Sequence, residues 1–183
     1  MKIISTKTVF TCPIFKVEER TVEVKNAVKE KHWVVVRQPN VSVVALTNEK
    51  KFVLIEQKRG KNNTISIEIP SGKLEKYNPS LKELENQALL ELEEEAGFKA
   101  NSIELLDVAE YSSNWRERKY YQYAAWDLNR VGQRLDHGEE ITVSLASLAD
   151  IEHMIKSSHN IIYDHEIDAL RKGIAFFKKT KLI

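Results

Sequence analysis

The sequence predicts an α+β fold or a mixed-sheet α/β sandwich. Strand-like segments come first, one amphipathic helix follows, and further strands precede the last helices, so the elements do not alternate as in a parallel sheet. The 183 residues include no Gly/Ser-rich linker and no evident repeat, and this length suits one domain. We therefore expect residues 1–183 to form a single domain.

The first part of the chain has the composition of strands. Residues 3–10, 14–24 and 31–37 are rich in Val, Ile, Thr and Phe. They predict an N-terminal β segment that covers about residues 1–37.

A stronger pair of strands follows. Val41–Leu46 and Lys51–Gln57 are apolar runs, and Thr47–Lys50 between them predicts a hairpin turn. Thr64–Ile69 predicts another short strand, and Pro70-Ser71-Gly72 ends it.

The helix that follows has two alternative starts. Asn78 can act as its N-cap with Pro79 at the first helical position, or Ser80 and Glu83 can form a capping box. Gly97 supplies the expected C-terminal end. The apolar stripe of this helix consists of Leu81, Leu84, Ala88 and Leu92.

The last third of the chain predicts three strands and two helices. Ser147 and Asp150 mark the start of a short helix, and residues 164–178 predict a final amphipathic helix. The strands are expected at residues 103–111, 118–128 and 140–145.

Composition excludes several classes of function. There are 28 Lys and Arg against 27 Asp and Glu, so no overall basic excess points to nucleic acid. The single cysteine, Cys12, excludes an intramolecular disulfide and a multi-cysteine zinc site. No apolar run reaches the ~18 residues of a membrane span, and the N-terminus lacks a signal peptide. We expect a soluble, cytoplasmic protein without membrane or nucleic-acid partners.

The densest cluster of charge lies at the end of the first helix. Helical spacing places Glu91, Glu94 and Glu95 on one face beside the apolar stripe, whereas Glu93 points elsewhere. An acidic run is often a solvated surface. Three carboxylates crowded beside a core face nevertheless favour a cation, and oxygen ligands suit Mg²⁺ or Mn²⁺.

The residues from Gly72 to Phe98 resemble the Nudix box, G-x5-E-x7-R-E-U-x-E-E-x-G-U, where U is an apolar residue. Its second half matches the segment Glu91–Phe98. Residues 68–72 are similar to the E-L-P-A-G lead-in of the ADP-ribose pyrophosphatase branch, and Gln57-Lys58-Arg59 is similar to its Q-x-R motif. Residues 138–143 resemble a loop that supplies a further carboxylate.

The chain differs from the family pattern in two respects. Leu90 stands where the family has an arginine that orients a box glutamate. Gly72 and Gly97 lie about four residues further apart than in the pattern, which implies an extra helical turn or a longer loop. For the first glutamate of the box, Glu83 and Glu85 are candidates, and the alternative is that this chain has no counterpart.

The resemblance implies a Nudix-like mixed-sheet α/β/α sandwich with an N-terminal antiparallel β segment. It implies a hydrolase that cleaves the pyrophosphate of a nucleoside diphosphate sugar, with ADP-ribose to AMP and ribose 5-phosphate as the leading case. GDP-mannose or another nucleotide sugar is the alternative substrate. A non-catalytic nucleotide-binding protein on the same scaffold is the alternative of a different class, and Leu90 favours it.

The resemblance also implies the metal ligands. Glu91 and Glu95 would be the principal ligands of Mg²⁺ or Mn²⁺. Glu94 would be a further ligand or would position a bound water, and the carbonyl of Ser71 would complete the coordination.

Residues outside the box are expected to complete the site. Glu139 or Glu140 would be the general base, although both can equally lie in a solvated turn. Arg59 is the candidate phosphate clamp, with a surface arginine as the alternative. Glu68 would bind a ribose or act as a buried structural carboxylate.

Two aromatic residues near the N-terminus are the candidates for base binding. Phe15 and Trp33 resemble the aromatic pair that sandwiches the nucleobase in this branch, although both can be core residues. Arg37, which follows Trp33, completes the predicted substrate-binding set. The resemblance further implies a homodimer in which the N-terminal β segments exchange and close each other's sites.

Overall fold

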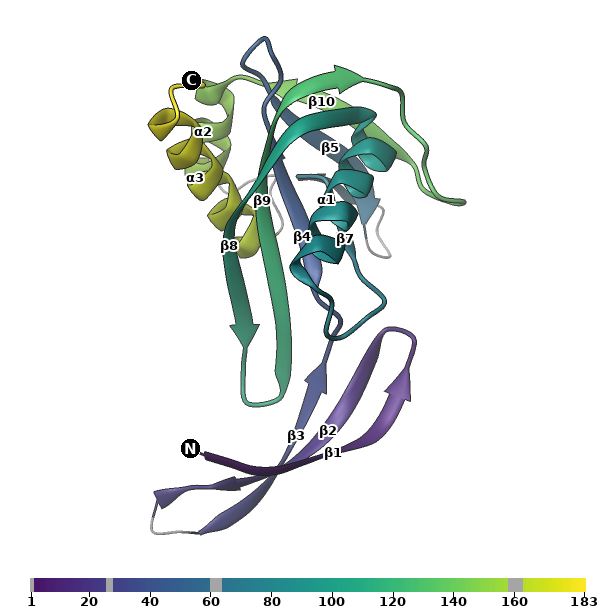
Figure 1. Ribbon diagram of the computed structural model, residues 1–183, viewed down its shortest axis with the longest axis vertical. Coiled ribbons are helices and arrows are strands. Elements are labelled where there is room, and N and C mark those ends of the chain that lie inside the picture. Colours follow the sequence, from purple (N-terminus) through teal and green to yellow (C-terminus); the bar gives the residue numbers. More distant parts are fainter. Residues whose placement is uncertain (1, 26–27, 60–63, 158–162) are drawn as a thin grey trace.

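The computed structural model describes residues 2–25, 28–59, 64–157 and 163–183 (Figure 1). The helices are α1 (Leu81–Ala96), α2 (Leu148–Ser157) and α3 (Asp164–Lys179). The strands are β1 (Lys2–Cys12), β2 (Phe15–Glu23), β3 (Lys29–Val36), β4 (Asn40–Ala45), β5 (Phe52–Arg59), β6 (Thr64–Glu68), β7 (Ser71–Lys73), β8 (Phe98–Ser112), β9 (Arg116–Arg130) and β10 (Ile141–Ala146). Every predicted helix and strand is present, and β7 is a short additional strand where a turn was expected.

The larger sheet is organised around β9. It has seven strands in the order β1-β2-β3-β9-β4-β7, and β8 pairs with β9 outside this path. β9 runs parallel first to β3, at Val35 and Val36, and then to β4 along Asn40–Ala45. Residues 37–39 lie between β3 and β4 while β9 continues past them, and Arg37 N still donates to Glu117 O of β9 at 3.0 Å.

The predicted hairpin turn between β4 and β5 is present, but the two strands diverge directly after it. The turn forms, because Lys50 N donates to Thr47 O at 3.0 Å. Beyond it, only the isolated bridge between Leu46 and Phe52 connects the strands. They diverge because each finds other partners: β4 pairs with β7 and β9, whereas β5 enters a three-stranded sheet in the order β10-β5-β6.

Helices cover the strands on both faces, which is the expected α/β/α sandwich (Figure 1). Successive residues of β4 point to opposite faces: Val43 packs in the core beneath α1, and Val44 packs in the core beneath α2 and α3. The close approach of α3 depends on Gly173, since a Cβ there would lie 2.5 Å from Val44 Cγ1. Both faces of β4 are therefore buried, which agrees with its four apolar residues, although Asn40 and Ser42 are polar.

The ends of α1 are fixed by local chemistry. Ser80 is the N-cap and forms the capping box with Glu83, so the second of the two predicted starts is correct. Gly97 ends the helix with a left-handed φ of 69°. Between them, Leu84, Ala88 and Leu92 are buried, whereas Leu81 is exposed and lies outside the core.

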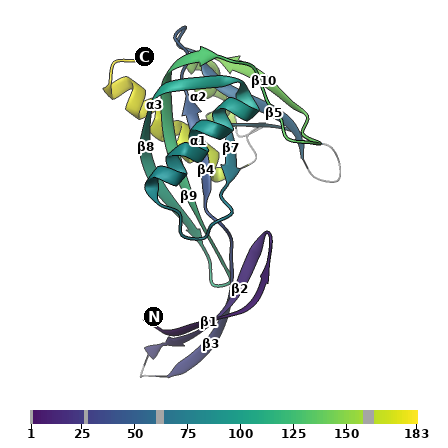
Figure 2. The same ribbon diagram turned by 45° about the vertical axis from the view of Figure 1, so that its right-hand side comes forward.

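The sheet formed by β1, β2 and β3 extends away from the rest of the molecule (Figures 1 and 2). It is the predicted N-terminal antiparallel segment. Its exposed apolar side chains are Ile3, Ile4, Val9, Phe10 and Trp33. Within the described ranges, no helix is long and apolar enough to cross a membrane.

Candidate active site

The carboxyl-terminal half of α1 packs against β7. The backbone N–H of Ser71 donates to Glu95 Oε2 at 2.8 Å. At the next residue, a Cβ on Gly72 would lie only 1.6 Å from Glu91 Oε1. The missing side chain of Gly72 thus leaves the space that the Glu91 carboxylate occupies.

Glu91, Glu94 and Glu95 form the acidic face of α1. Burial and like charges disfavour the ionised form of Glu91 and of Glu95. Burial raises the pKa of Glu95 to about 8, and the charges of Glu91 and Glu139 add to it, although the Ser71 hydrogen bond acts in the opposite direction. Burial also raises the pKa of Glu91, although the hydrogen bond from Gln87 acts in the opposite direction, and the charges of Glu94 and Glu139 add to the effect of burial. Both pKa values are therefore raised by burial and, in addition, by the charges of neighbouring carboxylates.

The other acidic residues of α1 divide as helical spacing predicts. Glu93 lies off the acidic face and pairs with Arg134 at 2.7 Å. Glu94 is half-buried and close enough for its charge to act on Glu91. Glu83 pairs with Lys76 and forms part of the N-terminal cap, so it lies more than two helical turns before Glu91, the first carboxylate of the cluster.

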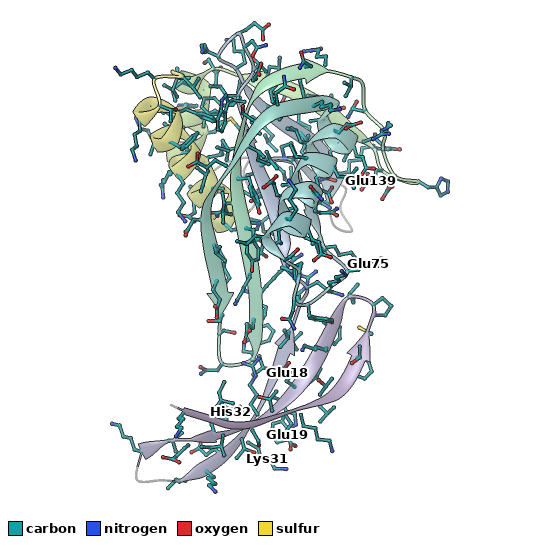
Figure 3. The ribbon with its side chains drawn as sticks, viewed as in Figure 1. Glu18, Glu19, Lys31, His32, Glu75 and Glu139 are labelled. Atoms are coloured by element: carbon teal, nitrogen blue, oxygen red, sulfur yellow. The ribbon has the colours of Figure 1, made fainter. Side chains whose placement is uncertain are left out.

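The two candidate bases have different surroundings. Glu139 acts electrostatically on both Glu91 and Glu95, and its carboxylate accepts from Asp136 N at 3.1 Å. It lies beside α1 in Figure 3. Glu140 instead pairs with Lys58 at 3.2 Å on the surface. Of the two, Glu139 is the residue that the fold brings to the acidic face.

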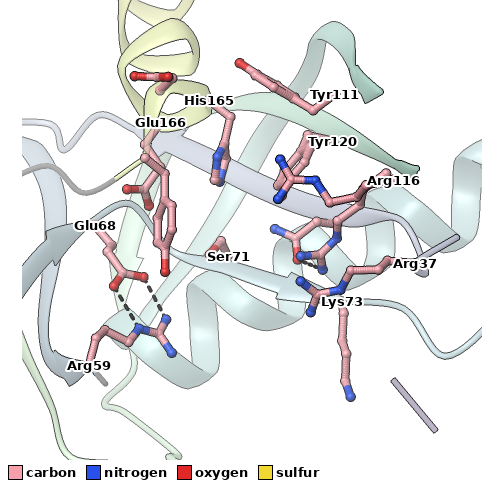
Figure 4. Close-up of a pocket in the computed structure, with 14 residues that line it drawn as sticks. Arg37, Arg59, Glu68, Ser71, Lys73, Tyr111, Arg116, Tyr120, His165 and Glu166 are labelled. Carbon is pink, nitrogen blue, oxygen red and sulfur yellow. Dashed lines mark hydrogen bonds and ion pairs between the residues drawn. The ribbon is translucent and has the colours of Figure 1, made fainter. Parts of the chain in front are cut away.

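Arg59 and Glu68 bind each other. Arg59 Nε donates to Glu68 Oε1 at 2.8 Å and Arg59 Nη2 donates to Oε2 at 2.7 Å (Figure 4). Burial alone would raise the pKa of Glu68, but hydrogen bonds from Arg59 and Ser66 outweigh it and lower the pKa. Glu68 is 2% exposed, so it has the surroundings of a buried structural carboxylate.

A cavity of about 530 Å³ extends from Ser71 and Glu68 past β9 to the start of α3 (Figure 4). It contains the predicted residues Arg37 and Arg59. Most of the other lining residues have no signal in the sequence, because β7, β9 and α3 meet only in the folded chain. The missed polar and aromatic residues include Lys73, Arg116, Arg118, Tyr120, His165 and Glu166.

His165 is part of an aromatic wall of this cavity. Its ring lies 4.1 Å from that of Tyr120, measured between centroids, and 5.9 Å from that of Tyr111. Burial, together with the charge of Arg118, lowers the pKa of His165 to about 4. The imidazole is therefore neutral near pH 7.

The two predicted base-binding aromatics do not meet within one chain. Trp33 lies opposite Glu19 in the β2–β3 register and is 54% exposed. Phe15 lies four residues from Glu19 along β2, which is roughly 13 Å of strand, and packs on Phe10. A sandwich of one base between them needs a second copy of the chain.

Glu166 is a buried carboxyl group in the first turn of α3. It is 2% exposed, and Oε2 has no hydrogen-bond partner among the described residues. Burial, with the neighbouring charge of Glu68, raises its pKa to about 9. Its position was a signal that could be read from sequence, because Glu166 continues the buried stripe of Ala169, Leu170 and Gly173.

Comparisons with known proteins identify the family and the fold of the chain. The family model described as NUDIX domain matches residues 36–165. The chain is 32% identical over 164 residues to the methanol dehydrogenase activator of Bacillus methanolicus, covering 89% of this chain and 86% of that protein. It is 28% identical over 165 residues to the ADP-ribose pyrophosphatase of Bacillus subtilis (strain 168), again covering 89% and 86%. A crystal structure of ADP compounds hydrolase has the same fold, with a TM-score of 0.77, 19% identity and coverage of 100% and 98%.

Glu166→Gln should change how stability depends on pH. Between the ordinary pKa of 4.5 and the folded value of about 9, the unfolded chain loses the Glu166 proton and the folded chain keeps it. The unfolded state then binds fewer protons, so this group lowers the free energy of unfolding as pH rises, by at most about 1.4 kcal/mol per pH unit. The variant should gain stability relative to wild type between pH 5 and 9 in urea unfolding. Parallel pH profiles, like those expected of the surface control Glu152→Gln, would contradict this assignment.

Leu90→Arg should cost little stability. Leu90 is 38% exposed on α1, on the side away from the buried stripe. We expect its free energy of unfolding to change by less than about 1 kcal/mol, as for other surface substitutions. Leu92→Ala, at a fully buried position, should lose about 2–5 kcal/mol in the same urea titration. Equal losses for the two variants would show that Leu90 is a core residue.

Proposed function

We propose that this chain, which belongs to the NUDIX family, hydrolyses the diphosphate bond of a nucleoside diphosphate sugar. ADP-ribose, giving AMP and ribose 5-phosphate, is the leading substrate. The observation that carries the proposal is the pair of half-buried Glu91 and buried Glu95 beside Ser71, a residue that lines the cavity. The ADP-ribose pyrophosphatase and ADP compounds hydrolase among the similar proteins support an adenine nucleotide.

A divalent cation fits the acidic face. In the described part of the chain, no three His, Cys, Asp or Glu groups are close enough together to enclose a metal ion. The donor set would instead combine Glu91 and Glu95 with the Ser71 carbonyl, and Glu94 as a ligand or through a bound water. Burial first, and then like charge, raises the pKa of Glu91 and of Glu95, and a bound cation would stabilise both charged forms. Oxygen donors suit Mg²⁺ or Mn²⁺. When bound, the ion would neutralise the diphosphate and lower the pKa of a water.

The base we propose is Glu139, with Glu140 as the alternative. In the reaction, the oxygen of a water bonds to one phosphorus atom and its proton passes to the carboxylate. The bond between the bridging oxygen and that phosphorus breaks, and the bridging oxygen leaves with the other phosphate. Support comes from the closeness of Glu139 to Glu91 and Glu95, whereas Lys58 engages Glu140.

We also propose that the protein is a homodimer that joins through the N-terminal sheet. The exposed apolar side chains of β1 and β3 support this, because an uncovered sheet of this kind favours association. A second copy would allow Trp33 of one chain and Phe15 of the other to stack on one base. Arg37 would contact the substrate in the cavity. Arg59, which also lines the cavity, is held in place by its hydrogen bonds to Glu68.

Neutralising the acidic face should abolish turnover without unfolding the protein. Glu91→Gln and Glu95→Gln each remove a ligand, so hydrolysis of ADP-ribose with Mg²⁺ should fall by orders of magnitude. The matched control is Glu93→Gln, whose side chain pairs with Arg134 off the face and should retain activity. Full activity in EDTA, or in Glu95→Gln, would refute the metal assignment; a folded wild type that hydrolyses no nucleotide sugar would favour the non-catalytic alternative.

Gly72→Ala should lower activity strongly while leaving the free energy of unfolding nearly unchanged. The added Cβ overlaps the flexible end of Glu91, so the carboxylate moves aside while the backbone stays in place. We expect a free energy of unfolding within about 1 kcal/mol of wild type and a large loss of Mg²⁺-dependent turnover. Raising Mg²⁺ should restore part of the rate. Unchanged kinetics at low Mg²⁺ would show that Glu91 does not act from this position.

Trp33→Ala tests the proposed base stacking. Stacking of a base on an aromatic ring contributes about 1–3 kcal/mol, so the Michaelis constant for ADP-ribose should rise roughly ten- to a hundredfold. The Mg²⁺ dependence should stay the same, because Trp33 is remote from α1. Wild-type kinetics in the variant would exclude stacking, and a monomer by light scattering would exclude the shared site.

A further inference from the structure

One end of the cavity carries four cations from three parts of the chain. Lys73 lies on β7, Arg116 and Arg118 lie on β9, and Arg37 lies in the break between β3 and β4 (Figure 4). Among the described residues, none of these four forms an ion pair with a carboxylate, although Asp164 also lines the cavity.

Arg118 is the fixed member of this basic end. Its Nε donates to the carbonyl of Gln38 at 3.1 Å, and its Nη2 donates to Asn40 Oδ1 at 2.8 Å. Both acceptors are neutral, and burial together with the charge of Arg37 lowers the pKa of Arg118. The guanidinium is thus oriented before any ligand binds and has a like charge beside it, a state that a bound anion would stabilise.

The basic end is separate from the acidic face. Ser71 pairs with Ser42, whereas Lys73 pairs with Asn40, the residue that holds Arg118. Lys73 is therefore two residues from Ser71 along β7, and Gln38, which also holds Arg118, is four residues from Ser42. This spacing corresponds to roughly 7–13 Å of strand. The two phosphorus atoms of a diphosphate share one oxygen and lie much closer together. A diphosphate placed at Ser71 for hydrolysis leaves the basic end to another anionic group.

We infer that this basic end binds a phosphate monoester that the substrate carries in addition to its diphosphate. The inference rests on the proposed hydrolysis and narrows its substrate class to nucleoside diphosphate derivatives with an extra phosphate. That phosphate sits on the nucleoside ribose or on the second group. Arg118 supplies the oriented guanidinium, and Arg37, Arg116 and Lys73 add charge around it. A cavity of about 530 Å³ has the size of a small-molecule site.

Calorimetric binding without turnover tests the basic end directly. Adenosine 2′,5′-bisphosphate is compared with AMP, and glucose 1,6-bisphosphate with glucose 1-phosphate. One bisphosphate should bind roughly ten- to a hundredfold tighter than its partner, the range of hydrogen bonds to a charged group. Arg118→Gln should remove this preference. Arg171→Gln, an equal charge change at an exposed position of α3, should retain it. The pair that shows the preference identifies which part of the substrate carries the phosphate.

Two results would overturn the inference. Equal binding within both pairs by the wild type would exclude an additional phosphate site. If Arg118→Gln lost the same affinity for the monophosphate as for the bisphosphate, the arginine would contact the phosphate that both compounds share. Should Arg118→Gln fail to fold, Arg37→Gln removes charge from an exposed position and must reduce the preference. A bisphosphate preference without any hydrolysis would refute the proposed function alone, and hydrolysis of ADP-ribose without the preference would refute this inference alone.

Discussion

Glu91 and Glu95 bring two carboxylates together on the buried side of α1, one helical turn apart. Burial and like charge raise the pKa of both groups. Without a bound cation, such an arrangement lowers the stability of the folded protein. A buried charge is ordinarily paired or bound to a metal. The surrounding structure keeps it in place through the Ser71 N–H, which donates to Glu95, and through Gly72, which leaves room for Glu91.

The rest of the fold positions this pair and the cavity beside it. The capping box at Ser80 and the left-handed Gly97 fix where α1 begins and ends, and its apolar stripe fixes which face is buried. β4 carries β7 on one side and β9 on the other, so the Arg59–Glu68 pair and the basic end line one cavity. Ser71 also lines this cavity and its N–H donates to Glu95, so the acidic face adjoins the cavity at Ser71. Arg118, which donates to Asn40, belongs to the basic end of the same cavity.

α1 could be predicted from local signals in the sequence, whereas the pairing of distant strands could not. The spacing of Glu91, Glu94 and Glu95 and the caps of the helix depend on residues within a few positions of one another, so the sequence contains them directly. The divergence of β4 and β5 depends on β9 and β10, which lie far along the chain. Arg118 was missed for the same reason, because the residues that hold it come from β4 and from the segment before it only after folding. The buried phase of Glu166 on α3 was a local signal, whereas its closeness to Glu68 of β6 depends on the folded chain.

The central claim is that the buried carboxylate pair is a cation site, and equilibrium unfolding in Mg²⁺ tests it most directly. A ligand that binds only the folded state stabilises it by RT ln(1 + [L]/Kd). The wild type should therefore gain free energy of unfolding with the logarithm of Mg²⁺ concentration. The double variant Glu91→Gln with Glu95→Gln should be at least as stable as wild type in EDTA and should not respond to Mg²⁺. A wild type that is indifferent to Mg²⁺, or a double variant that responds equally, would contradict the account.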